Sequence, residues 1–167
     1  FVQCITAAIA DGYNGLIIDS ASHEWFAGAL PMVDEETRRS GNKNAFTSGW
    51  SVVTPLHNEF LESIVKCPIH IIVTGRDKMD YTLVTENGKT VPKKMGLAPV
   101  QRDGFEYEFD VVGVMTPDHT VEFTKAAGIL DELDGKMYPK PTSEVGKWIA
   151  ETLRGVETHA IPQESIV

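Results

Sequence analysis

Helical and strand patterns alternate along the first part of the chain. Apolar residues recur at helical spacing over Phe1–Ala10, and Asp11-Gly12 supplies a stop signal. The short apolar run Gly15–Asp19 (GLIID) ends in a carboxylate and is typical of a strand buried on both faces, as in a parallel sheet. Trp25–Arg39 is a mixed stretch, helical or irregular, and a polar loop follows it.

A second helix and a second strand come next. Trp50–Lys66 is expected to be a helix, with Pro55 in its first turn or at a kink, because proline lacks the amide proton needed further inside. The expected apolar face of this helix consists of Leu56, Phe60, Leu61, Ile64 and Val65. Ile69–Thr74 (IHIIVT) predicts another buried strand, followed by Gly75-Arg76. The order helix, strand, helix, strand, without a hairpin signal, predicts a parallel α/β sheet.

The second part of the chain carries hairpin signals instead. Tyr81–Thr85 and Thr90–Lys94 flank Asn87-Gly88, a strong turn dipeptide. Asp110–Met115 and Thr120–Thr124 flank a Pro-Asp-His turn. These patterns predict two antiparallel hairpins after the parallel sheet.

A helix near the end completes the pattern. Thr142 or Ser143 is expected as its N-cap, and Gly155 as its end. Its expected apolar face consists of Val145, Trp148, Ile149 and Leu153. We therefore expect one domain over residues 1–155, followed by a tail at residues 156–167.

Composition narrows the class of protein. The 167 residues suit one domain with its own core, and no apolar run approaches the ~20 residues that cross a bilayer. The net charge of −9 disfavours binding of a nucleic-acid backbone by this segment alone, since that binding depends on lysine and arginine. Cys4 and Cys67 lie far apart in apolar stretches and predict two buried, reduced thiols, as in the cytoplasm.

Polar residues follow both predicted parallel strands. The carboxyl ends of parallel strands are where ligands bind in open α/β sheets, so Asp19-Ser20 and Thr74-Gly75-Arg76 are expected to converge on one edge. An apolar strand that ends in aspartate has the form of a Walker B element, whose carboxylate orients water on Mg²⁺. The alternative is a carboxylate that caps the next turn.

Two further features carry candidate chemistry. Glu24 could polarise a water in a nucleotide site, or it is an exposed loop carboxylate; both alternatives stay open here. His23-Glu24-Trp25 is not an H-E-x-x-H motif, and the other histidines show no ligand spacing. In Ala98–Asp110 (APVQRDGFEYEFD), aromatic residues alternate with acids after Gln101-Arg102-Asp103, an alternation that would fit a half-buried strand.

Several of these stretches resemble the phage-type AAA ATPases of the RecA fold. They are DSASHEW, SGW-x-x-V-T-P-x-H-N-x-F, IIVTGR, GLAPVQRDGFEYEFD and PTSEVGKWIAETLRG. The resemblance covers about Phe1 to Gly155. It implies a RecA-like parallel sheet core with helices on both faces and C-terminal β-hairpins, here lacking the P-loop strand.

The resemblance has one large departure. Members of the family carry a G-x-x-x-x-G-K-[ST] loop whose backbone amides and lysine hold the phosphates, and this motif is absent from the sequence. The resemblance implies that the chain starts in the helix just before the Walker B strand, and we expect it to be a fragment or a processed chain. We expect this chain alone to bind ATP poorly and to hydrolyse it hardly at all.

The resemblance also implies roles for individual residues. Asp19 matches the Walker B carboxylate on Mg²⁺, and Ser20 matches the small hydroxyl residue after it. Thr74 and Arg76 match the strand end at which this fold senses the γ-phosphate of ATP. Rings of this fold also insert a basic residue into the neighbouring subunit's site, where it offsets transition-state charge. Arg102 and Lys125 are the candidates for that role in trans. Glu24 is the candidate catalytic carboxylate because of its place five residues past Asp19, and not because of the resemblance.

Three functions are therefore weighed. The first is an ATP-hydrolysing phage or prophage protein of DNA recombination or single-strand annealing in the bacterial cytoplasm, a homo-oligomer whose partners include single-stranded DNA or a phage recombination protein. The second is a non-catalytic, truncated relative that acts as a binding or assembly module. The third is a metal-dependent hydrolase built on Asp19, His23 and Glu24. An unpaired edge beside the Walker B strand further predicts self-association or an unusual compensating arrangement.

Overall fold

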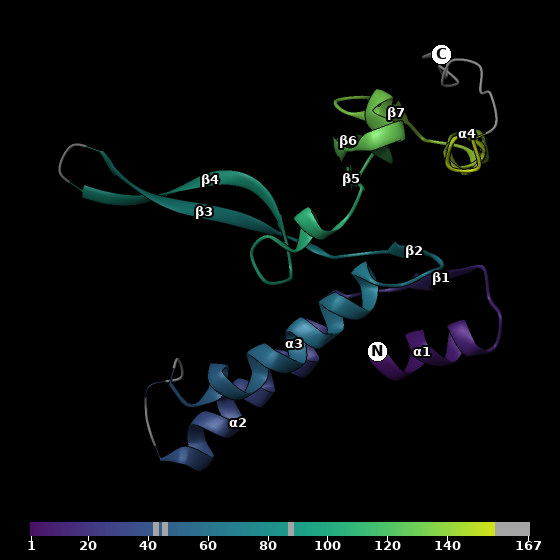
Figure 1. The fold of residues 1–167 in the computed structure, drawn as a ribbon. Coiled ribbons are helices and arrows are strands. Elements are labelled where there is room, and N and C mark those ends of the chain that lie inside the picture. The colour runs from purple at the N-terminus through teal and green to yellow at the C-terminus, as the bar shows by residue number, and fades with distance from the viewer. Residues whose placement is uncertain (42–43, 45–46, 87–88, 156–167) are drawn as a thin grey trace. The chain divides into compact units, whose positions relative to one another are not determined.

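The computed structural model describes residues 1–41, 44, 47–86 and 89–155. The chain packs as two compact units, Phe1–Phe105 and Glu106–Val167 (Figure 1). Each unit has its own sheets and its own buried side chains. The tail predicted at residues 156–167 lies outside the described residues, and the predicted domain boundary at residue 155 stays a prediction.

The first unit contains the alternation of helices and strands that the sequence predicts. Its elements are α1 (Val2–Ala10), β1 (Gly15–Ile18), a π-helical turn η1 (Glu24–Ala29), α2 (Leu30–Ser40), α3 (Gly49–Val65), β2 (His70–Val73), β3 (Asp77–Glu86) and β4 (Lys89–Pro99). The predicted helix and strand of the first pattern are confirmed, and the chain leaves α1 through Gly12, whose φ of +79° favours glycine. The mixed stretch Trp25–Arg39 is helical throughout.

Strands β1 and β2 pair in parallel, as predicted. Leu16 lies opposite Ile71 and Ile17 opposite Ile72, in a sheet of two strands. The expectation that these strands are buried on both faces is wrong. Ile17 is 67% exposed and Ile72 is 62% exposed, whereas Ile18 is buried. The reason is that this sheet has two strands only, and within the described unit the face that carries Ile17 and Ile72 stays open to solvent.

Helices α2 and α3 lie side by side and enclose a small core of Ala29, Val33 and Val53 (Figure 1). The rings of Trp25 and Trp50 stack beside it, with centroids 5.4 Å apart.

The predicted apolar face of α3 is wrong in part. Its buried side chains are Val53, His57, Phe60 and Ile64, whereas Leu56 and Val65 are exposed. The buried face of α3 includes a histidine, which a prediction from apolar residues alone does not count. The predicted face is therefore rotated around the helix relative to the observed one. Pro55 lies inside α3, beyond its first turn.

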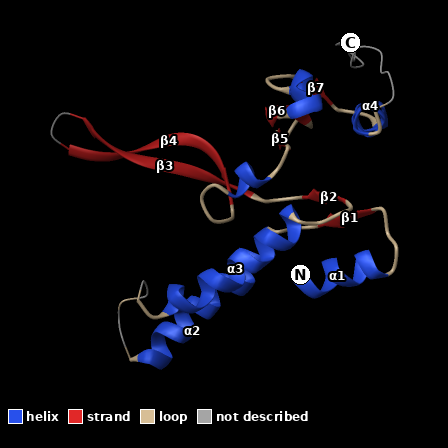
Figure 2. Cartoon of the chain, viewed as in Figure 1, coloured by secondary structure: helices blue, strands red, loops and turns tan. Residues whose placement is uncertain are grey.

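The first predicted hairpin is confirmed and is longer than expected. Strands β3 and β4 pair antiparallel from Asp77 opposite Pro99 to Glu86 opposite Lys89 (Figure 2). The register shifts between Asp80 and Tyr81. The predicted turn at Asn87-Gly88 lies outside the described residues.

The second unit is built on three antiparallel strands and a helix. Its elements are β5 (Val111–Met115), β6 (Thr120–Ala126), a 3₁₀ turn η3 (Gly128–Leu133), β7 (Met137–Pro139) and α4 (Ser143–Leu153), and the strand order is β5-β6-β7. The second predicted hairpin is confirmed, and β7 was not predicted. Residues Phe105–Glu108 form a 3₁₀ turn, η2, so the half-buried strand suggested by the alternation of aromatic and acidic residues is wrong.

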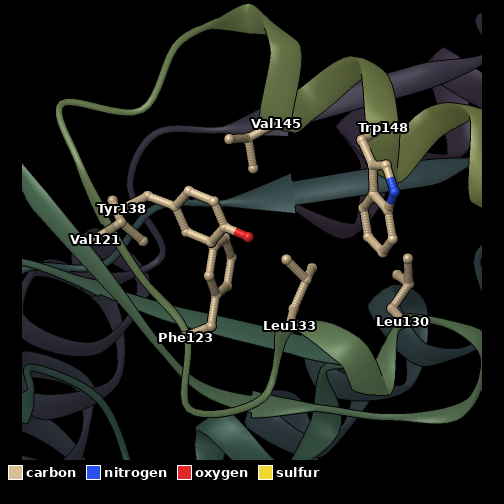
Figure 3. Close-up of a cluster of buried hydrophobic side chains, with 7 residues drawn as sticks. All are labelled: Val121, Phe123, Leu130, Leu133, Tyr138, Val145 and Trp148. Carbon is tan, nitrogen blue, oxygen red and sulfur yellow. The ribbon is translucent and has the colours of Figure 1, made fainter. Parts of the chain in front are cut away.

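The core of the second unit joins its sheet to α4. Its buried residues are Val121, Phe123, Leu130, Leu133, Tyr138, Val145 and Trp148 (Figure 3). The rings of Phe123 and Tyr138 meet edge to face at 5.7 Å, and burial raises the pKa of the Tyr138 phenol. The predicted N-cap is confirmed, because the Thr142 side chain accepts a hydrogen bond from the Glu144 amide.

Both cysteines have free thiols, but their predicted burial is wrong. Cys4 is exposed and Cys67 is half-buried. Cys4 lies in α1 and Cys67 follows α3, and an apolar neighbourhood in sequence does not guarantee burial at either place. Over the described residues, no helix combines the length and the apolar character needed to cross a membrane.

Candidate functional site

The carboxyl ends of β1 and β2 are joined by side chains as well as by the strand ladder. The Thr74 hydroxyl donates a 2.7 Å hydrogen bond to Oδ1 of Asp19. The Thr74 amide donates to the carbonyl of Ile18 at 2.9 Å, and the Ala21 amide donates to the carbonyl of Thr74 at 3.0 Å. The two strand ends predicted to converge therefore lie in direct contact.

Two serines after β1 connect the same loops. The buried Ser20 hydroxyl is hydrogen-bonded to Nδ1 of His23 at 3.1 Å. The Ser22 hydroxyl, also buried, accepts a 2.8 Å hydrogen bond from the Arg76 amide. Ser22 was not among the predicted site residues, although it ties the second strand end to the first.

Arg76 follows the end of β2, and its guanidinium packs on an aromatic ring. Its central carbon lies 5.6 Å from the centroid of the Phe26 ring, within the range of a cation–π contact. The Phe26 ring in turn lies 5.0 Å from the His23 ring. Within the described residues the Arg76 side chain has no ion-pair partner, so its charge is available to an anion.

Glu24 is the centre of a partly buried polar cluster. Nδ1 of His57 lies 3.1 and 3.2 Å from its two carboxylate oxygens. Nε2 of Gln101 donates to Oε2 of Glu24 at 3.1 Å and to the Ala21 carbonyl at 3.3 Å. The Glu24 side chain is only 14% exposed and lies on a helical turn. The alternative of an exposed loop carboxylate is therefore wrong.

His57 and Gln101 are site residues that the sequence did not single out. His57 lies on α3 at helical spacing from the buried Val53 and Phe60, and that spacing was the available signal. Gln101 lies in Ala98–Asp110, the stretch from which the sequence offered its neighbour Arg102 as a candidate. The Gln101 side chain accepts a hydrogen bond from the Arg102 amide at 2.8 Å, so it holds Arg102 only through the backbone.

The other predicted basic residue lies in the second unit. The Lys125 ammonium donates to the Tyr107 carbonyl at 2.7 Å and lies 5.9 Å from the centroid of the Tyr107 ring. These contacts stay within its own unit. Lys125 belongs to the second unit and the strand-end residues to the first, so its role in trans stays a prediction.

No ligand cluster for a metal hydrolase forms in the part of the chain that the structure describes. There, no three or more histidine, cysteine or acidic side chains gather closely enough to hold a metal ion. His23 turns to Ser20, and Glu24 turns to His57. The alternative built on Asp19, His23 and Glu24 therefore finds no support in this geometry.

A comparison with protein families decides the identity. The family model described as "AAA domain" matches residues 1–152. The chain belongs to this AAA domain family. Searches of characterised proteins and of solved structures gave no significant match. The AAA domain is of the P-loop NTPase type, so its family function is nucleotide binding of the ATPase kind.

The group of this AAA domain that best suits a magnesium nucleotide is the Asp19 carboxylate. The Asp19 carboxylate is exposed, and within the described residues its Oδ2 has no hydrogen-bond partner, so a hard oxygen ligand faces solvent. A phosphate loop is not recognisable in residues 1–167. A Gly-Lys-Thr triplet occurs at residues 88–90, but Leu83 stands where the first glycine of the loop would be, and Lys89 and Thr90 belong to a strand.

Proposed function

We propose that this AAA domain contributes the Walker B strand and the adjacent γ-phosphate-sensing strand of a RecA-fold ATPase. The observation that carries the proposal is the hydrogen bond between Thr74 and Asp19 at the carboxyl ends of two parallel strands. Ligands bind at that edge in open α/β sheets, and a carboxylate on a strand end is the group that orients magnesium-bound water.

Each residue of the edge has a part in this proposal. Asp19 holds Mg²⁺ through its exposed carboxylate, and the buried Ser20 fixes the backbone that follows it. Thr74 and Arg76 face the γ-phosphate, where the Arg76 guanidinium offsets negative charge. Glu24 polarises the attacking water. Bound Mg²⁺ supplies charge neutralisation at the phosphates.

We propose that a longer form of the chain or a partner supplies the phosphate loop of this site, since residues 1–167 lack the G-x-x-x-x-G-K-[ST] motif. We propose a homo-oligomer with sites between subunits, in which Arg102 or Lys125 reaches the neighbouring nucleotide. The edge of β1 that does not face β2 supports this, since it has no strand partner among the described residues.

The biological setting that we propose is phage or prophage DNA recombination or single-strand annealing, in the bacterial cytoplasm. With a net charge of −9, this chain is poorly suited to hold the phosphate backbone by itself. Single-stranded DNA would therefore be bound together with a more basic partner, such as a phage recombination protein.

A second candidate function is a non-catalytic assembly module. The absence of a G-x-x-x-x-G-K-[ST] loop from residues 1–167 favours it, because the loop supplies most phosphate contacts in P-loop proteins. In that case the polar contacts around Asp19 and Glu24 hold the scaffold together and no nucleotide binds.

Calorimetric titration of the protein at its natural full length with Mg²⁺ and a non-hydrolysable ATP analogue separates the two candidates. We expect Asp19→Ala to weaken binding at least about tenfold, or ~1.4 kcal/mol. The control is Asp34→Ala, which removes an exposed carboxylate of α2 and the same charge. Weaker binding in the Asp19 variant only supports the ATPase. Equal binding in both variants contradicts the role of Asp19, and no binding by the wild type favours the assembly module.

A further inference from the structure

We propose that His57 is a positioning residue, which holds the Glu24 carboxylate in the orientation needed to polarise the attacking water. The inference rests on the function proposed above, in which Glu24 acts on that water. It concerns a residue of α3, far from the strand ends in sequence, that reaches the site through a single side-chain contact.

The contact between His57 and Glu24 fixes the orientation of the Glu24 carboxylate. Nδ1 of His57 lies at nearly equal distances, 3.1 and 3.2 Å, from the two oxygens of Glu24. A donor placed midway between two carboxylate oxygens resists rotation of the carboxylate in either sense. The contact spans 33 residues of sequence, so it is a product of the packing of α3 against the turn η1.

The surroundings of the imidazole hold it still. The His57 side chain is 0% exposed, and its ring lies 5.4 Å from the Trp25 ring in an edge contact and 6.5 Å from the Phe60 ring. Aromatic neighbours on a helix and a helical turn leave the imidazole little room to rotate. A ring fixed by packing is suited to fix the group that it hydrogen-bonds.

The second ring nitrogen argues against a purely structural role. Nε2 of His57 is buried, and in the described chain it has no hydrogen-bond partner. An unsatisfied buried polar atom lowers stability, and such atoms in native structures call for a functional explanation. An aliphatic residue would fill this space without that cost. What a histidine adds here is the Nδ1–H group that faces Glu24.

Gln101 completes the support from the other side. Its Nε2 donates to Oε2 of Glu24, so the carboxylate is held by donors from two different segments. The small exposed fraction of the Glu24 side chain leaves access for a water. A general base held in this way approaches its proton in one orientation, and loss of that orientation slows the chemical step rather than substrate binding.

Three substitutions of His57 test the inference in the protein at its natural full length, by steady-state ATP hydrolysis. Asn places its amide nitrogen close to the position of Nδ1, Gln places it close to Nε2, and Leu removes the donor. We expect His57→Leu and His57→Gln to lower kcat by about tenfold to a hundredfold, with KM within about twofold. His57→Asn should restore most of kcat. Thermal unfolding shows whether each variant is folded.

The pair His57→Asn and His57→Gln keeps the test sharp if His57→Leu fails to fold, since both replacements are polar amides. Equal kcat in these two variants, or a change in KM alone, overturns the inference. Glu24→Gln separates it from the proposed function. If Glu24→Gln keeps full activity, or if the wild type does not hydrolyse ATP, the proposed function fails and the inference falls with it. If Glu24→Gln is inactive but His57→Gln is not, only the inference fails.

Discussion

The Thr74 hydroxyl donates a 2.7 Å hydrogen bond to the Asp19 carboxylate, across 55 positions of sequence. This bond links the ends of two parallel strands, and within the described residues the second oxygen of Asp19 has no hydrogen-bond partner. Both side chains are exposed, so the bond orients the carboxylate more than it stabilises the fold.

Replacing Thr74 separates orientation from stability. We expect Thr74→Ala to weaken binding of a magnesium–ATP analogue by about 1 kcal/mol, or roughly fivefold in Kd, because Asp19 then rotates freely. The free energy of unfolding should change by less than about 0.5 kcal/mol, since the site is exposed. Calorimetry and denaturant unfolding measure the two quantities. Thr74→Ser keeps the hydroxyl and should bind as the wild type does; a loss in Thr74→Ser equal to that in Thr74→Ala would contradict the assignment.

Gly49 marks a close approach of α3 to α2. A Cβ at this position would lie 2.5 Å from the Val33 carbonyl oxygen and 2.6 Å from the Thr37 hydroxyl. We expect Gly49→Ala to destabilise the first unit by about 1–3 kcal/mol, because the helices must move apart. Denaturant unfolding checks this.

Gly28→Ala is the matched control in the same unit. A Cβ at Gly28 would meet only the His23 carbonyl, at an ordinary 3.9 Å, and the residue lies on the helical turn η1. We expect this variant to be as stable as the wild type or slightly more stable, since alanine favours helix over glycine. Equal destabilisation by both variants would show that the α2–α3 contact is not the cause.

The turn between β5 and β6 predicts a specific pH response. Hydrogen bonds from the hydroxyls of Thr116 and Thr120 hold the pKa of the Asp118 carboxyl below its ordinary value of 3.8. A lowered folded-state pKa adds stability above the pKa of the unfolded chain, and that stability is lost as pH falls through the folded-state value. The free energy of unfolding should therefore fall less steeply at low pH in Asp118→Asn than in the wild type.

A carboxyl titration by NMR measures this pKa directly. We expect Thr116→Val to move the pKa of Asp118 back towards its ordinary value, since the Thr116 hydroxyl is its first donor. Thr124→Val removes a hydroxyl from the exposed part of the same hairpin and should leave the titration unchanged. An Asp118 that titrates identically in the wild type and in Thr116→Val would refute the hydrogen-bond explanation.

Much of the element order was predictable because its signals are local. The period of apolar residues marked α1, α3, β1 and β2, and the turn dipeptide and N-cap marked the first hairpin and α4. Parallel pairing of β1 with β2 followed from the absence of a hairpin signal between them. Convergence of Asp19 and Thr74 then required only the rule that parallel strands end at one edge.

What the sequence by itself determined about this protein is thus the succession of helices and strands and the strand-end residues. Only the tertiary structure decided which side of α3 is buried, that Ile17 and Ile72 face solvent, and that Glu24 is held by His57 and Gln101. The physical reason is range. Periodicity and turn chemistry act between residues close in sequence, whereas burial of a histidine or support of a carboxylate depends on side chains that only the packing of distant segments brings together.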